Sequence, residues 1–252
     1  MKFAAKIISA LLYGAAIADQ VFEPETQEQL PEVSESFTKS LADFDRLLAK
    51  LNELGGELHK VKLSEVDVGN REMVASENIS AGDLIAYIPE DMILDFQEAH
   101  SSKAVTQLKE NEVFEKLSEK DRDSIALALY LMEQGKESES KWKEYLEILP
   151  TDVSNFPLFY ENETLDWFKG GELGGYIKAM KSQLEETFRT MASGIHDFRA
   201  GYPEEQFQRL YKLIDSRKFS LANEERQFSA LIPVVDLFNQ GRAPGVESGW
   251  KE

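Results

Sequence analysis

The pattern of hydrophobic and polar positions divides the chain into a first helix, a group of short strands, a long helical stretch and a return to strand. Apolar residues recur every three or four positions from Phe37 to Leu51, which predicts an amphipathic helix. Gly55-Gly56 follows it and is expected to cap its C-terminus. The next part alternates between apolar and polar positions, and we expect short strands there, at residues 58–63, 73–75 and 84–88.

The periodicity is helical from about residue 101 to residue 213. Residues 124–134 are apolar on nearly all sides, which predicts a buried helix. Trp142, Tyr145 and Leu149 are expected to share one buried face of the next helix, ended by Pro150. Tyr176 to Met191 predicts a further helix, and Gly170-Gly171 and Gly174-Gly175 before it are interpreted as loop residues.

The last part of the chain returns to an apolar run, for which we expect a strand at Pro233–Phe238 followed by turn residues. The order of elements predicts the α+β class, with short strands interrupted by a mainly helical insert. We expect one domain over residues 36–252. Its parts are N-terminal strands at 57–95, a helical insert at 96–213 and a C-terminal part at 214–252.

The N-terminus has the layout of a secretory signal peptide. Residues 1–18 combine a short basic start, an apolar run and an Ala-Ile-Ala cleavage signal. Residues 19–35 are rich in glutamate and are interpreted as an acidic linker. We therefore expect entry into the secretory pathway, to the ER lumen or beyond, with no transmembrane span after cleavage. Asn78 and Asn162 lie in glycosylation sequons that would be used only there.

Composition excludes several classes of chemistry. The chain of 252 residues has a net charge of −18, so it lacks the basic excess that non-specific nucleic-acid binding needs. It has no cysteine, which excludes disulfides, thiolate metal sites and cysteine nucleophiles. Its three histidines lie far apart in the sequence, which argues against a histidine-rich metal site or a histidine-based catalytic triad.

Five short segments, at consistent intervals, resemble the SET-domain protein-lysine methyltransferases. The most similar group is the one typified by the Rubisco large-subunit methyltransferase, in which a helical insert splits the SET strands. The segments are the helix end at Gly55-Gly56, Met73–Pro89 with its Asn-Ile-Ser-Ala-Gly-Asp turn, Trp142–Pro150, Ser216–Phe219 and Leu231–Asn239.

This resemblance implies transfer of a methyl group from S-adenosyl-L-methionine to a lysine of a protein substrate. It places the turn before Met73, with Asn70 and Arg71, along the cofactor, where it would supply backbone contacts. Arg217 would bind the carboxylate end of the cofactor, because a guanidinium suits a planar anion. Asn239 and Gln240 would hold the cofactor beside the Pro233–Phe238 segment. The chemistry needs no metal ion.

The chain departs from the family pattern at three points. Glu72 stands where small residues usually let the cofactor approach closely. Gln240 replaces the histidine of the usual Asn-His pair. The family's catalytic tyrosine is expected after this pair, whereas the last tyrosine here is Tyr211, so no catalytic residue is assigned. The sequence therefore predicts an incomplete or degenerate copy.

Two other interpretations stay open. One is a non-catalytic SET-like module that binds a partner protein through its helical insert and acidic face. The other is a Rossmann-type methyltransferase, suggested by the run Val66–Gly69, although no further glycine follows in the required spacing. For localisation, the signal peptide is also compatible with a two-step route through the ER into a plastid.

Overall fold

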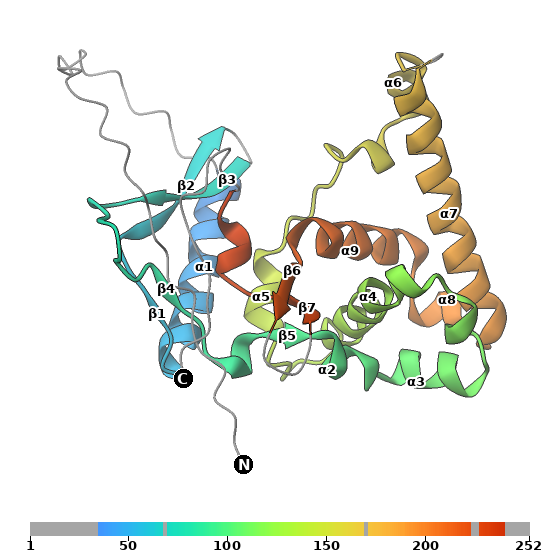
Figure 1. Cartoon of the computed structure of the whole chain (residues 1–252), viewed down its shortest axis with the longest axis horizontal. Helices are drawn as coiled ribbons and strands as arrows, with labels where there is room; N and C mark the ends of the chain where they lie inside the picture. The colour runs from blue at the N-terminus through green and yellow to red at the C-terminus, as the bar shows by residue number, and fades with distance from the viewer. Residues whose placement is uncertain (1–34, 68–69, 169–170, 223–226, 240–252) are drawn as a thin grey trace. The chain divides into compact units, whose positions relative to one another are not determined.

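The computed structural model describes residues 35–67, 70–168, 171–222 and 227–239, which form two compact units. Of the described residues, unit 1 contains those within 35–93 and 232–239, and unit 2 contains those within 94–222 and 227–231. Helices and short strands are both present (Figure 1), which confirms the predicted α+β class.

Unit 1 begins with the predicted amphipathic helix, α1 (Glu35–Glu53). Phe44, Leu47 and Leu51 are buried along its apolar side. The helix ends as predicted, because Gly55 adopts a φ of 81° that favours glycine. The N–H of Gly56 then donates to the carbonyl of Leu51 at 2.8 Å, which satisfies a carbonyl that the helix leaves without a partner.

Two antiparallel strand pairs follow in unit 1. The first joins β1 (Glu57–Leu58) to β4 (Ala86–Tyr87), and the second joins β2 (Val61–Asp67) to β3 (Asn70–Ala75). The strands lie where the pattern predicts them, but their predicted boundaries are wrong. Residues 58–63 do not form one strand, because Lys60 has a φ of 57°, which interrupts the extended backbone. Of residues 84–88, only Ala86 and Tyr87 pair.

Unit 2 is mainly helical. The predicted buried helix is α4 (Arg122–Gln134), in which every residue from Ser124 to Met132 is buried. It packs against α2, α3 and α9 (Figure 1). Trp142, Tyr145 and Leu149 are also buried, as expected. The other α-helices of this unit are α2 (Phe96–His100), α3 (Lys103–Glu110), α5 (Lys143–Ile148), α6 (Asn162–Asp166), α7 (Glu172–Gly194), α8 (Phe198–Gly201) and α9 (Glu204–Arg217).

A three-stranded antiparallel sheet in unit 2 has the order β5-β7-β6. Its strands are β5 (Leu94–Asp95), β6 (Phe219–Ala222) and β7 (Gln227–Leu231). The expected strand at Pro233–Phe238 is wrong, since the paired strand ends at Leu231. Pro233 has no N–H for a strand ladder. A single 3-10 turn, η5 (Val235–Leu237), occupies the segment instead. The other 3-10 turns are η1 (Glu90–Met92), η2 (Phe114–Lys116), η3 (Glu119–Asp121) and η4 (Pro157–Phe159).

The interpretation of Gly174-Gly175 as loop residues is wrong, because both lie in the first turns of α7. Gly174 is buried there, and a Cβ on it would lie 2.5 Å from the carbonyl oxygen of Phe168. Backbone approaches that close require glycine. Gly174 therefore lets the segment after α6 pack onto the start of α7.

We expect Gly174→Ala to lower the free energy of unfolding by about 2 kcal/mol, because the added methyl forces the backbone at Phe168 to move. Gly175→Ala is the matched control. Nothing lies within 4 Å of a Cβ at Gly175, so alanine should stabilise the helix by up to about 1 kcal/mol. Urea unfolding followed by far-UV circular dichroism measures both. Equal effects of the two substitutions would contradict the close approach.

The predicted signal peptide at residues 1–18 lies outside the described residues, as does the acidic linker except for Glu35, where α1 begins. In the part of the chain that the structure describes, no helix has both the length and the apolar character needed to cross a membrane.

Candidate cofactor site

Strand β3 carries three of the predicted cofactor-binding residues, namely Asn70, Arg71 and Met73. The sequence predicted a turn for the first two, and this is wrong. Asn70 pairs with Asp67 and Arg71 pairs with Glu65, with an irregular register between these two pairs. The extended backbone here comes from the hairpin with β2, so any contact with a ligand would be made along a strand rather than a turn.

The Arg71 side chain is directed to the first helix of unit 1. Its Nη1 donates a hydrogen bond to Ser40 Oγ on α1, at 3.0 Å. Side chains alternate between the faces of a strand, so Met73 shares the Arg71 face and Glu72 points to the other. Arg71 and Met73 can therefore contribute backbone groups to a ligand on the Glu72 face, as the sequence predicted for this segment, but not their side chains.

Glu72 makes the contact that defines this candidate site. Asn239 Nδ2 donates a hydrogen bond to Glu72 Oε2 at 2.6 Å, although the two residues lie 167 positions apart in the sequence. The bond turns the Asn239 amide nitrogen toward β3, so its Oδ1 points away from Glu72. Glu72, which the sequence marks as a departure from the family, thus holds the very asparagine that the family pattern assigns to the cofactor.

The backbone just before Asn239 is strained. Val234 is fully buried and has a φ of 74°, a conformation that is rare for a β-branched residue. Such residues cost about 1–3 kcal/mol and occur mainly where a functional geometry must be held. The turn is followed by η5, which packs against β3 within unit 1. This arrangement brings Asn239 to Glu72.

Arg217 belongs to the other unit, where it is the last residue of α9 and is half-buried. The following residue anchors this helix end. Lys218 Nζ donates to Ser124 Oγ on α4 at 3.1 Å, and the Lys218 N–H donates to the Ile214 carbonyl at 2.8 Å. The guanidinium of Arg217 therefore extends from a helix end that is tied to the core of unit 2.

The structure therefore brings only part of the predicted site together, namely the residues of β3 and Asn239. Asn70, Arg71, Met73 and Asn239 lie in unit 1, Arg217 lies in unit 2, and Gln240 lies outside the described residues. Sequence reasoning missed the contact between Glu72 and Asn239. The available signal was an acidic side chain in a position where a small residue is usual, on a strand that was already expected to contact the cofactor.

Tyr211, the last tyrosine of the chain, is engaged elsewhere. Its hydroxyl donates to Asp121 Oδ1 at 3.0 Å within unit 2. Burial, first, and the adjacent Asp121 carboxylate, second, raise the pKa of Tyr211 above its ordinary value. The phenol therefore stays protonated at neutral pH and holds α9 to the segment before α4.

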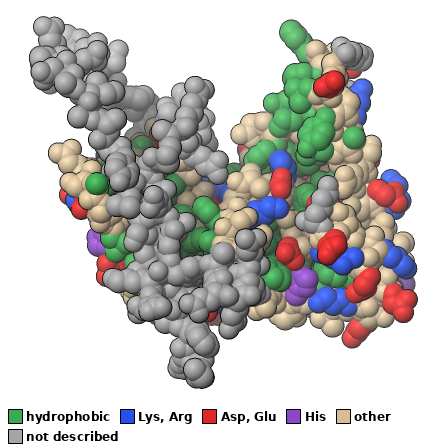
Figure 2. Space-filling model, viewed as in Figure 1, with side chains coloured by type: hydrophobic (Ala, Val, Ile, Leu, Met, Phe, Trp, Pro, Cys, Tyr) green, Lys and Arg blue, Asp and Glu red, His purple; other side chains and the backbone are tan. Residues whose placement is uncertain are grey.

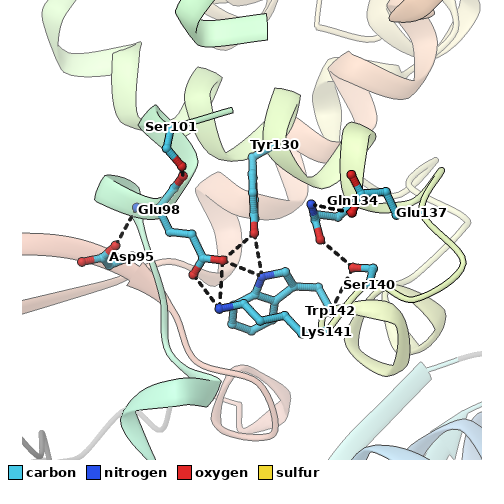
Figure 3. Close-up of polar contacts among 9 residues, drawn as sticks. All are labelled: Asp95, Glu98, Ser101, Tyr130, Gln134, Glu137, Ser140, Lys141 and Trp142. Atoms are coloured by element: carbon cyan, nitrogen blue, oxygen red, sulfur yellow. Dashed lines mark hydrogen bonds and ion pairs between the residues drawn. The ribbon is translucent and has the colours of Figure 1, made fainter. Parts of the chain in front are cut away.

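A second polar cluster lies in unit 2, around the carboxylate of Glu98 on α2 (Figure 3). Tyr130 on α4 donates its hydroxyl proton to Glu98 Oε1 at 2.5 Å, and Trp142 Nε1 donates to the same oxygen at 3.3 Å. Lys141 Nζ lies 2.9 Å from the carboxylate. Burial and the Glu98 hydrogen bond raise the pKa of Tyr130. Because its members come from α2, α4 and the segment before α5, the cluster joins these elements.

Comparisons with known proteins agree on one fold. No family model matches the chain. A curated chloroplastic protein of Arabidopsis thaliana, a [fructose-bisphosphate aldolase]-lysine N-methyltransferase, is 27% identical over 124 residues, which are 47% of this chain and 25% of that protein.

Two solved structures are similar over most of the chain. The SET domain of LSMT bound to lysine and AdoHcy has a TM-score of 0.64 and 21% identity, covering 79% of this chain and 45% of the other. Rubisco LSMT bound to sinefungin and monomethyllysine has a TM-score of 0.64 and 20% identity, covering 82% of this chain and 49% of the other.

The chain therefore spans less than half the length of the proteins that it matches. Within that span, the strand pairs of unit 1, the helices of unit 2 and the return to strand follow the order that the sequence predicted. The chain has the SET fold, as found in the SET domain of Rubisco LSMT.

Proposed function

We propose that this chain is the SET part of a protein-lysine N-methyltransferase that uses S-adenosyl-L-methionine. The observation that carries the proposal is the hydrogen bond between Asn239 and Glu72, which joins the two sequence segments expected at the cofactor. It occurs in a fold shared with structures bound to AdoMet, AdoHcy and lysine. In this proposal residues 57–95 and 214–252 form the SET part, and residues 96–213 form the insert.

The reaction is a direct displacement. The lysine nitrogen attacks the methyl carbon of the sulfonium, the carbon–sulfur bond breaks, S-adenosyl-L-homocysteine leaves and the amine releases a proton. Most of the rate gain comes from holding nitrogen, methyl and sulfur in line. Neither a metal ion nor a covalent nucleophile is required. A dry channel would favour the neutral amine, because burial disfavours the charged form of lysine.

The predicted residues take different roles. The β3 backbone at Asn70, Arg71 and Met73 would run along the cofactor. Asn239 and Gln240 would hold it from the segment after η5. Arg217 would bind its carboxylate with a planar pair of donors. Glu72 acts through Asn239 and is therefore a positioning residue.

Glu72→Ala should weaken binding of S-adenosyl-L-methionine about fivefold to tenfold, because the Asn239 amide loses the acceptor that orients it. Glu72→Gln is the matched control. Its side-chain oxygen still accepts from Asn239 while its charge is lost, so affinity should stay within about twofold of wild type. Isothermal titration calorimetry measures both. Equal loss in the two variants would assign the effect to charge and contradict a positioning role.

We infer that the protein acts in a plastid, which it would reach through the ER by means of residues 1–18. The support is the chloroplastic relative together with the layout of the N-terminus. A tagged full chain in plant or algal cells tests this by microscopy. Plastid fluorescence is expected, whereas secretion with glycosylation at Asn78 or Asn162 would contradict the plastid route.

Methyl transfer is tested with S-adenosyl-L-methionine labelled in its methyl group. The acceptors are fructose-bisphosphate aldolase and Rubisco, which are named for the relatives. Label recovered in lysine, and strongly reduced with the Arg217→Ala chain at a subsaturating cofactor concentration, is the expected result. Cofactor binding without transfer to any lysine would favour the alternative of a non-catalytic SET-like module that binds a partner protein.

A further inference from the structure

The first turns of α7 carry apolar side chains that are exposed beside the buried face of the helix. Leu173, Met180, Leu184 and Met191 are spaced by four or seven residues, so they lie on one face of the helix. Leu184 and Met191 are buried, and Met180 is half-buried. Leu173, however, is 53% exposed, and Tyr176, one turn along, is 64% exposed. Gly174 and Ile177 are buried in the same turns, so Leu173 and Tyr176 lie beside the buried face of the helix and are directed toward solvent.

A third exposed apolar side chain lies in the segment just before α7. Trp167, directly after α6, is 87% exposed. In Figure 1 the first turns of α7 extend past α4 and α9 to α6, and Figure 2 shows hydrophobic side chains gathered at that end of unit 2. We call Trp167, Leu173 and Tyr176 the α6–α7 patch. Contiguous exposed apolar patches, especially those with a polar rim, mark interaction sites.

Residues on either side of the patch pack within unit 2. Leu165 is buried, and the Tyr160 and Phe168 rings stack with their planes at 14°. Gly174 is buried against the Phe168 carbonyl. The apolar side chains next to the patch in sequence therefore already have partners inside unit 2. Trp167, Leu173 and Tyr176 are exposed and remain available to a partner.

Acidic residues outnumber basic ones in the segment that carries the patch, and Lys178 and Lys181 follow it on α7. Residues 160–176 contain four acidic residues and one basic residue, Lys169. The four are exposed, and they are Glu161, Glu163, Asp166 and Glu172. A partner that fits this surface needs apolar side chains for the patch and positive charge for its rim. Exposed Trp and Tyr rings also attract Lys and Arg directly, through cation–π contacts.

We propose that the α6–α7 patch docks a basic amphipathic segment of a partner protein, with apolar side chains on Trp167, Leu173 and Tyr176 and with Lys or Arg beside the surrounding carboxylates. A second copy of this chain fits less well, because each copy carries a net charge of −18 and the same acidic rim. The docking does not depend on the cofactor site, so it holds for the enzyme and for a non-catalytic module alike.

The test uses a short, fluorescently labelled, helix-forming peptide of leucine and lysine, titrated with the full chain and followed by anisotropy. Saturable binding is expected, and the Trp167→Ala/Tyr176→Ser double variant should weaken it about tenfold, because buried aromatic anchors dominate such interfaces. The matched control is Leu54→Ser. Leu54 is an exposed apolar residue of unit 1, 39% exposed, and its replacement should leave the affinity unchanged.

The charge requirement is tested separately. Glu163→Gln/Glu172→Gln should weaken binding and flatten its salt dependence, and a leucine–glutamate peptide should not bind. Equal affinity in wild type and the Trp167→Ala/Tyr176→Ser variant would overturn the proposal. So would equal binding of the two peptides. Concentration-dependent dimerisation that the aromatic substitutions abolish would assign the patch to a second copy and overturn the proposal too.

Discussion

Glu98→Ala should lower the free energy of unfolding by about 3 kcal/mol, one of the two largest effects that we expect. The Glu98 carboxylate accepts hydrogen bonds from Tyr130 and Trp142, which are both buried (Figure 3). Trp142 Nε1 keeps a second acceptor, the Tyr130 hydroxyl oxygen at 3.1 Å, so the Tyr130 hydroxyl is the donor that loses its partner. Leaving a buried donor unsatisfied costs about 1–3 kcal/mol. Lys141, which is half exposed, can return to water at little cost.

Two controls separate the acceptor from the charge of Glu98. Glu98→Gln keeps a side-chain oxygen for the Tyr130 hydroxyl and loses only the ion pair with Lys141, so it should cost about 1 kcal/mol or less. Glu139→Ala removes an exposed glutamate from the segment between α4 and α5 and should change little. Urea unfolding followed by circular dichroism measures all three variants. Equal stability of Glu98→Ala and Glu139→Ala would contradict a stabilising cluster.

Arg217→Ala should weaken binding of S-adenosyl-L-methionine by roughly 30- to 100-fold. A guanidinium that forms two hydrogen bonds to a carboxylate contributes about 2–3 kcal/mol, and few other side chains can replace its geometry. Arg217→Lys keeps the charge but not the paired donors, so it should recover only part of the affinity. Calorimetric titration of the cofactor into each variant gives the dissociation constants.

The matched control for Arg217 is Lys212→Ala on the same helix. Lys212 forms an ion pair with Asp215 at 2.9 Å, so its loss changes the charge of α9 without touching the proposed cofactor residue. Its affinity for the cofactor should equal that of wild type. If Arg217→Ala folds and binds as tightly as Lys212→Ala, the assignment of Arg217 to the cofactor carboxylate is wrong.

The sequence predicted the helices well because their apolar periodicity extends over many residues. The run from Ser124 to Met132 predicts a buried helix, and the structure has one there. Short strands give a weaker signal, since a single residue changes their limits. Lys60 adopts a positive φ and divides a run that alternates as one strand. In the sequence, Gly174 is typical of a loop, but it lies inside α7. A close backbone contact with Phe168, which the sequence does not reveal, explains why glycine is needed there.

The site was predictable in outline and not in detail. The resemblance to the SET-domain methyltransferases located the β3 segment and Asn239, and the structure brings these two together. It did not reveal that Glu72 is the link, because a hydrogen bond between residues so far apart depends on the tertiary fold. Nor did it reveal the turn at Val234. That residue is β-branched and prefers extended backbone, so local propensity favours the strand that the structure lacks.

The most direct test of the central claim is a calorimetric titration of S-adenosyl-L-methionine into the folded wild-type chain, with a thermal-shift measurement on the same sample. The account predicts saturable binding of one cofactor per chain with a dissociation constant in the micromolar range and a raised melting temperature. A folded protein that gives neither heat nor a thermal shift would contradict the cofactor site and, with it, the proposed methyl transfer by this chain.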